Sequence, residues 1–172
     1  MSSIDEIQFI LDYIRTDDTS FRFNKLNLLY RGSRDGDSTK TCHLLCDYKT
    51  NILIIIYSDN GYKFGGYCKI GFETDNKFLS KDKIDNNSFI HSINFKKVYP
   101  AIKDKYVIYY ADDSWGLCFT DTLRFHDNFM KNSYSKIGYS ADKFFNDLDK
   151  PSVINGGSIY FKCKDLEVFQ FQ

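Results

Sequence analysis

The chain has 172 residues, including 16 phenylalanines and 13 tyrosines but only two prolines. A chain of this length forms one domain with a real core, because folding buries roughly 70% of the surface that the unfolded chain exposes. Lysine and arginine together number 23, and so do aspartate and glutamate. This balance provides no long-range attraction to nucleic acid, which is therefore not an expected partner.

Cysteine usage and hydropathy indicate a cytoplasmic protein. The five cysteines are an odd number scattered through the chain, unlike the disulfide framework of a small secreted domain. The first residues lack the basic and apolar segments of a signal peptide. The longest apolar run, residues 52–57, is too short to cross a bilayer, so we expect no integral membrane segment.

The chain begins with a predicted helix and a connection. Apolar residues recur at helical spacing and predict an amphipathic helix over residues 4–14 that covers one edge of the core, through Ile7, Ile10, Leu11 and Ile14. The mostly polar residues 16–24 follow as a connection. We therefore expect residues 1–25 to pack as helix and connection on a domain of residues 26–172.

A strand, a glycine-containing turn and a short helix are expected next. Residues 26–31 read as a strand that enters a turn over residues 32–36. Ser38 is a plausible N-cap of the helix that follows. Helical spacing places Cys42, Leu45 and Cys46 on its inner face, with His43 to the side.

Residues 52–57 are apolar without alternation, which is typical of a central strand buried on both faces. Asn60-Gly61 follows and predicts a hairpin with a type I′ turn, which needs positive φ at both central residues. The returning strand, residues 62–70, contains Gly65-Gly66. This pair marks either a β-bulge or a close backbone approach.

The rest of the chain consists of short strands between turns. Residues 75–87 are charged and rich in asparagine, and predict a surface loop. Further strands are expected over residues 89–95, 106–111, 117–120, 159–163 and 166–171. Many short strands joined by glycine and asparagine turns predict a mainly β (α+β) fold, an antiparallel sandwich.

An ordered set of motifs carries a resemblance to a known family. The set comprises residues 29–38 (LYRGSRDGDS), His43 and Cys46, Asn60-Gly61, residues 64–67 (FGGY), 88–93, 114–116, 121–123, 135–139 and 166–169. Together they resemble the TLDc domain, the module of the oxidation resistance protein family, here as a stand-alone domain. The likeness departs from the family pattern at residues 47–50, where the family has glycines.

The resemblance implies a sandwich of two antiparallel sheets flanked by short helices. It implies a non-enzymatic protein-interaction module that protects cells from oxidative stress by binding and regulating the vacuolar proton-pumping ATPase. Recruitment to endomembrane or vacuolar surfaces would follow. No catalytic residue or cofactor is carried over. The signature positions, structural or partner-binding, are Ser33, Asp35, Gly36, His43, Gly65, Gly66, Gly116 and Glu167.

The cysteines leave a second function open. Cys42, His43 and Cys46 lie close together, but a zinc site needs four ligands at recognisable spacing, so we expect no metal. Cys42 lies near the start of its predicted helix, where a thiolate is favoured. The alternative function is therefore a redox protein that acts on oxidants through Cys42.

Other chemistry finds less support in the sequence. Asp112-Asp113 suggests acid–base catalysis, but turn capping is the favoured role for two acids in this setting. Ser33 has no identifiable base, and the chain contains neither a nucleophile elbow nor a phosphate-binding loop. Arg31 and Arg34 either form a small basic patch for an acidic partner or pair locally.

Overall fold

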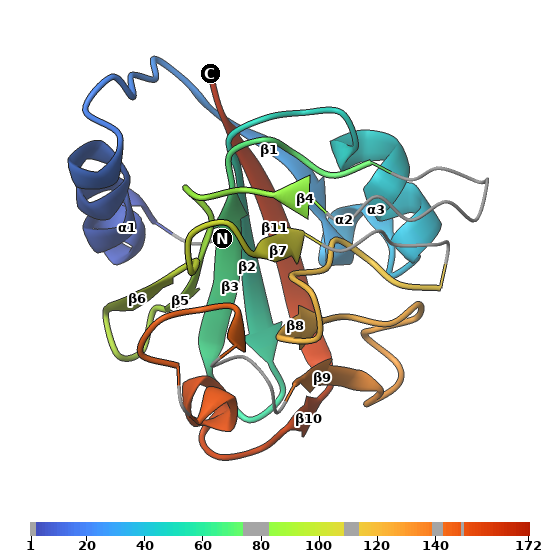
Figure 1. The fold of residues 1–172 in the computed structure, drawn as a ribbon. Helices are drawn as coiled ribbons and strands as arrows, with labels where there is room; N and C mark the ends of the chain where they lie inside the picture. The colour runs from blue at the N-terminus through green and yellow to red at the C-terminus, as the bar shows by residue number, and fades with distance from the viewer. Residues whose placement is uncertain (1–2, 74–82, 109–113, 139–142, 149) are drawn as a thin grey trace.

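The computed structural model describes residues 3–73, 83–108, 114–138, 143–148 and 150–172 (Figure 1). Its centre is a six-stranded antiparallel sheet in the order β1-β11-β2-β3-β5-β6. The strands are β1 (Leu26–Arg31), β2 (Ile52–Ser58), β3 (Lys63–Cys68), β5 (Phe89–Ser92), β6 (Lys97–Pro100) and β11 (Cys163–Phe171). The C-terminal strand therefore lies inside the sheet, between β1 and β2.

Two small antiparallel sheets form the second layer. One has three strands, β8 (Leu123–Arg124), β9 (Ser135–Ile137) and β10 (Tyr160–Phe161), and the other has two, β4 (Lys83–Ile84) and β7 (Tyr106–Ile108). The helices are α1 (Ile4–Asp17), α2 (Gly32–Asp35), α3 (Thr39–Cys46) and the 3-10 helix η2 (Pro151–Asn155). The predicted mainly β sandwich with short helices is confirmed.

The apolar run forms a central strand that is buried on both faces, as predicted. Ile52, Ile54 and Ile56 of β2 face one core, and Leu53 and Ile55 face the other. All five side chains are buried. The alternation of a pleated strand therefore divides one continuous apolar run between two cores.

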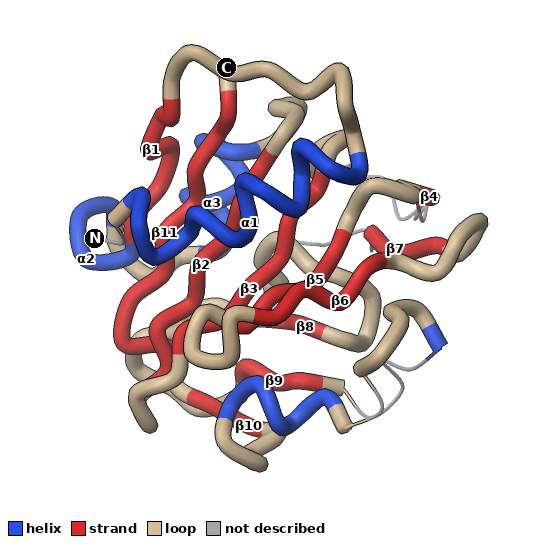
Figure 2. The backbone as a smooth tube through the Cα atoms, turned by 90° about the vertical axis from the view of Figure 1, so that its left-hand side faces the viewer, coloured by secondary structure: helices blue, strands red, loops and turns tan. Residues whose placement is uncertain are grey.

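Helix α1 covers one face of the central sheet (Figure 2). Its buried residues are the four predicted from the helical spacing, and they pack against Leu53, Ile55, Tyr67, Phe89 and Phe169. A capping box starts the helix, since the Glu6 amide donates to Ser3 Oγ and the Ser3 amide donates to the Glu6 carboxylate. We call this side of the sheet the helix face.

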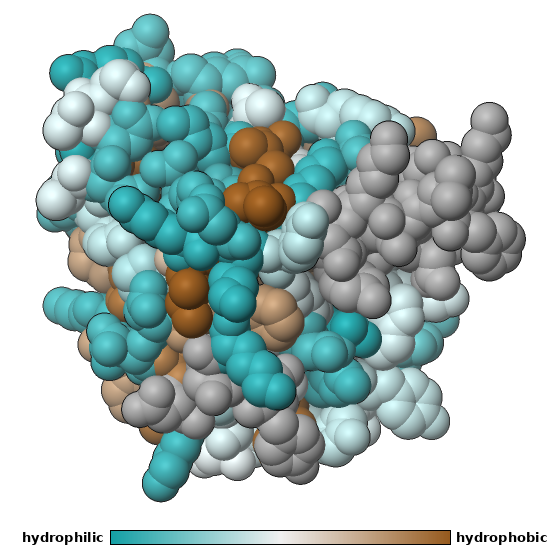
Figure 3. Space-filling model, viewed as in Figure 1, coloured by the Kyte–Doolittle hydropathy of each residue, from teal (hydrophilic) through white to brown (hydrophobic). Residues whose placement is uncertain are grey.

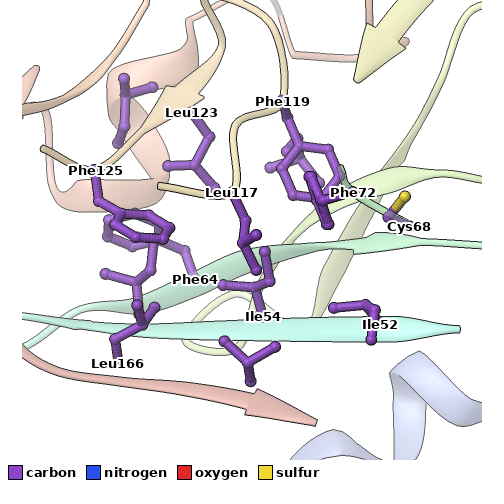
Figure 4. Close-up of a cluster of buried hydrophobic side chains, with 14 of the residues drawn as sticks. Ile52, Ile54, Phe64, Cys68, Phe72, Leu117, Phe119, Leu123, Phe125 and Leu166 are labelled. Carbon is purple, nitrogen blue, oxygen red and sulfur yellow. The ribbon is translucent and has the colours of Figure 1, made fainter. Parts of the chain in front are cut away.

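Irregular segments cover the opposite side, which we call the turn face. Side chains from β2, β3 and β11 meet Leu117, Phe119, Leu123 and Phe125 there (Figure 4). Segment 117–120, predicted as a strand, contributes an isolated bridge between Phe119 and Leu123 rather than a strand, because the chain turns tightly directly after Phe119. Thr120 has φ 48° and the amides of Thr122 and Leu123 both donate to the Phe119 carbonyl, so the predicted strand is wrong.

The β2–β3 hairpin forms, but its turn differs from the predicted type. Gly61 has φ 89°, whereas Asn60 does not adopt positive φ, so the turn is not type I′. A positive φ at Gly61 alone fits a longer loop that ends in a left-handed residue, and Ser58 and Tyr62 close it through the Ser58 amide and the Tyr62 carbonyl. The hairpin signal was therefore correct in position and wrong in detail.

Gly65 and Gly66 lie in a regular part of the sheet. Their register with β2 and β5 is unbroken, so the bulge interpretation is wrong and the close approach is correct. A Cβ on Gly65 would overlap the Ile54 carbonyl oxygen, and a Cβ on Gly66 would lie 2.5 Å from the Phe119 ring. The two glycines thus admit close neighbours on opposite faces of β3.

Candidate interaction site at the turn between β1 and α2

The glycine-containing motif folds as a single helical turn, α2, at the end of β1. Gly32 is buried against Asp165 and Met130, and a Cβ there would lie 3.1 Å from an atom of each. Gly36 ends the turn with φ 92°, a conformation that favours glycine. The Asp35 carboxylate accepts from the Arg31 amide at 2.8 Å, so Asp35 caps the turn. Gly36 is therefore favoured by its backbone conformation, and Gly32 by the side chains that pack closely against it.

Ser33 and β11 are joined through Asp165. The Ser33 amide and hydroxyl donate to the two Asp165 carboxylate oxygens at 2.9 and 2.8 Å, and Arg31 Nε donates to the same group at 3.1 Å. Burial acts to raise the pKa of Asp165, but donation from Ser33 and Arg31 leaves this pKa below its usual value. Asp165 is thus held as a carboxylate.

Glu167 occupies the inner end of the same network. Its side chain is fully buried, with Oε2 accepting from Tyr57 Oη at 2.7 Å and Oε1 3.6 Å from Arg31 Nε. Hydrogen bonding to Asp165 is the main reason why the pKa of Arg31 is raised. One guanidinium therefore serves two carboxylates that lie two positions apart on β11.

This arrangement joins elements rather than preparing a reaction. The Ser33 hydroxyl donates to a carboxylate whose pKa is lowered, which makes Asp165 a weak base for activating a nucleophile. Arg34 pairs with Asp35 at 2.7 Å, and Arg31 pairs with Asp165 and Glu167. The sequence left open a basic patch for an acidic partner or local ion pairs, and the structure shows local ion pairs.

Asp165 is a member of this network that the sequence did not single out. It lies two residues before Glu167 on one strand, so the two side chains share a face of the sheet. This two-residue spacing was the only feature of the sequence that linked Asp165 to Glu167. The role of Asp165 depends on Arg31, which is 134 residues away in sequence and approaches only after β1 and β11 have paired.

His43 and Gly116 belong to a second group, between α3 and the turn at residues 114–118. His43 was expected to lie to the side, but it is buried, with 4% of its surface exposed. Its Nδ1 lies 2.8 Å from Asp47 Oδ1 and its Nε2 lies 2.8 Å from the Trp115 carbonyl oxygen. A Cβ on Gly116 would overlap the Phe125 ring. The imidazole therefore fastens α3 to this turn.

The thiol of Cys42 is fully buried on the inner face of α3, as is that of Cys46. Burial, with a smaller contribution from the Cys46 side chain, raises the pKa of Cys42 well above its ordinary value. A redox role requires an accessible thiolate, so this environment disfavours the alternative function. Among the residues that the structure describes, no three metal-ligating side chains gather into a candidate metal site.

The predicted turn role of Asp112-Asp113 and the predicted N-cap role of Ser38 remain to be compared with the structure. The Asp112-Asp113 pair lies outside the described residues. Ser38 occupies the N-cap position of α3, but its side chain does not cap the helix. Instead, the Asp127 carboxylate accepts from the Thr39 amide at 2.9 Å, so the cap comes from a residue 88 positions away.

The face drawn in Figure 3 carries small apolar patches on its described residues. In Figure 3 the hydrophobic residues on this face are scattered among hydrophilic ones. The two most exposed large apolar side chains in the described part of the chain are Leu44 and Tyr48, at 83% and 75% exposure. They are four positions apart, at and just beyond the end of α3.

The comparison with protein families supports the resemblance seen in the motifs. The model of the TLDc domain matches residues 2–172, nearly the whole chain. The chain therefore belongs to the TLDc domain family, the module of oxidation resistance proteins. No curated protein matches the chain. Within the described residues, no helix has the length and apolar character that crossing a membrane requires.

Proposed function

We propose that the chain acts as a non-enzymatic protein-interaction module whose partner is the vacuolar proton-pumping ATPase. The family match over residues 2–172 carries the proposal. Ser33, Asp35 and Glu167 support it, because each is engaged with other residues of the domain through hydrogen bonds. These signature residues then stabilise the fold, and the partner binds the surface that the fold presents.

The consequence of binding is regulated assembly of the pump and resistance to oxidative stress. The protein acts in the cytoplasm and is recruited to vacuolar or other endomembrane surfaces through the pump. The signature side chains contribute by holding α2 and α3 in place. Leu44 and Tyr48 are the apolar side chains that we expect to contact the partner, since interface cores are enriched in such residues.

Affinity capture from cytosol and native membranes tests this proposal. The wild-type chain should recover pump subunits under conditions that preserve the assembly. The double variant Leu44→Ser, Tyr48→Ser should recover fewer, and Tyr160→Ser, which also removes an exposed tyrosine, should recover as many as the wild type. Failure of the wild-type chain to recover any subunit would sink the partner assignment.

A peroxide-consumption assay tests the alternative function, which is direct action on oxidants through Cys42. If this alternative is correct, the purified domain consumes peroxide and the Cys42→Ser variant does not. The raised pKa of Cys42 leaves little thiolate for attack, so we expect negligible consumption by both proteins. Turnover that disappears in Cys42→Ser would replace the interaction module with a redox function.

A further inference from the structure

The two edges of the central sheet differ in how they are protected against pairing with another chain. Within the described residues, the open edges are β1 and β6, because they end the strand order. Strand β6 has only four residues, with an exposed Lys97 at its start and Pro100, which cannot donate, at its end. Short length, lysine and proline are the usual means by which natural edges avoid association. Strand β1 has six residues and contains neither lysine nor proline, although its register with β11 is interrupted by a bulge.

Strand β1 is also the more apolar edge. It carries Leu26, Leu28 and Leu29, all partly exposed. Its register with β11 shifts between Leu28 and Tyr30, so Leu29 lies at an irregularity. A six-residue edge with partly exposed leucines is a site where a further strand can add.

The ion pair of Arg34 and Asp35 covers the end of this edge. Arg34 Nη2 donates to the Leu29 carbonyl at 3.1 Å, and the Asp35 carboxylate accepts from the Arg31 amide at 2.8 Å. The two side chains hold each other through two contacts of 2.8 and 2.7 Å. One backbone acceptor and one backbone donor, on either side of Tyr30, are thus occupied by side chains of α2.

A carbonyl and an amide so placed are the groups that an added antiparallel strand uses. The guanidinium supplies the donor and the carboxylate the acceptor that the incoming strand would supply. The pair therefore stands where a second strand would pair, and it must leave before one can add.

We infer that the Arg34–Asp35 pair is an edge guard that keeps β1 from pairing with β1 of a second copy of this chain. A second copy is the occupant because antiparallel pairing of β1 with itself is isologous: the apolar segment of each strand meets the same segment of the other. Two central sheets would then join into one across a twofold axis. With the guard in place, the chain is monomeric.

The test is the mass in solution of the full chain over a range of concentrations, in reducing buffer so that cysteines do not cross-link. Arg34→Ala removes the bond to the Leu29 carbonyl and the pair with Asp35. Arg15→Ala is the matched control, because Arg15 is an exposed arginine of α1 that pairs with Asp12 at 3.8 Å. We expect the wild type and Arg15→Ala to remain monomeric.

Arg34→Ala should dimerise, with self-association about tenfold stronger than wild type or more, equivalent to about 1.4 kcal/mol. Amide exchange over residues 26–29 should slow in the dimer, and exchange in β6 should not change. Arg34→Gln, which keeps most of the side chain, is the second variant if Arg34→Ala loses its native circular dichroism. Folded variants that stay monomeric, or a dimer protected at any place other than β1, would overturn the inference.

Discussion

The two faces of the central sheet are covered by different kinds of structure. On the helix face, one continuous element, α1, supplies four buried residues and two ion pairs at its ends, Glu6 with Lys63 and Asp18 with Lys69. On the turn face, the covering side chains come from many short segments spread over residues 42–161. We therefore expect the helix face to open by release of a single element, and the turn face to open only when the whole domain unfolds.

The largest effect is expected at β3, where adjacent glycines point to the two faces. Gly65→Ala would place a methyl group against the Ile54 carbonyl, and neither paired strand can move away. We expect a loss of more than about 4 kcal/mol, so that little folded protein forms. Gly66→Ala meets the Phe119 side chain rather than backbone, at a longer distance of 2.5 Å, and should cost less. Denaturant unfolding of both variants provides the measurement.

Gly61→Ala is the control for the glycine variants. Gly61 has positive φ, but a Cβ there would have open space around it. A cost of about 1 kcal/mol is expected from backbone strain alone. If Gly65→Ala were as stable as Gly61→Ala, the close approach of β2 and β3 would not limit the sequence at this position.

Large-to-small substitutions separate the two faces directly. Ile54→Ala on the turn face and Ile10→Ala in α1 each remove a fully buried side chain. We expect losses of about 4 and about 3 kcal/mol, within the range for such cavities, with the smaller loss in α1 because a helix can settle into the space.

Hydrogen exchange distinguishes the two losses by location. Ile10→Ala should speed exchange in α1 while the sheet stays protected, and Ile54→Ala should speed exchange everywhere. Uniform exchange in both variants would show that α1 and the sheet unfold as one unit.

Acid should weaken the helix face through His91. This residue is fully buried beside Phe89, and its Nε2 lies 3.0 Å from the Ile54 carbonyl oxygen. Burial lowers the pKa of His91 to about 4 from 6.5. Folding thus favours the neutral form, so this contribution to stability is complete above pH 6.5 and is lost as the pH falls from 6.5 to 4. The loss is about 3 kcal/mol at the acid end.

The variant His91→Gln isolates this contribution, because glutamine does not titrate. Asp35 and Asp165 also lose stabilising charge in acid, since their pKa values are lowered in the fold. The difference between wild-type and variant unfolding free energies, followed from pH 7 to 4, removes these shared contributions. A difference that does not change with pH would contradict the role assigned to His91.

The helix face was predictable because its signals are local. Helical spacing over residues 4–14 identified the buried side of α1, and the unbroken run at residues 52–57 identified a strand with two buried faces. Aromatic residues on the turn face gave no comparable period. Phe119, for example, looks like a strand residue, but a positive φ at Thr120 turns the chain there.

The candidate site divides in the same way. Gly32, Asp35 and Gly36 could be recognised as a turn from adjacent residues alone. The roles of Ser33 and Glu167 could not, because they depend on Asp165 and Arg31, which meet only when β1 and β11 pair. Interactions between residues far apart in sequence produce no local pattern from which they could be predicted.

Helix capping gives the smallest effect and the clearest contrast between local and distant control. Ser3→Ala removes the cap of α1, and Asp127→Ala removes the distant cap of α3; each should cost about 1 kcal/mol. Ser38→Ala should change stability by less than about 0.5 kcal/mol, because the Ser38 side chain caps nothing. Thermal unfolding of the three variants measures this ranking. A cost for Ser38→Ala equal to that for Asp127→Ala would mean that the start of α3 is fixed by its own sequence after all.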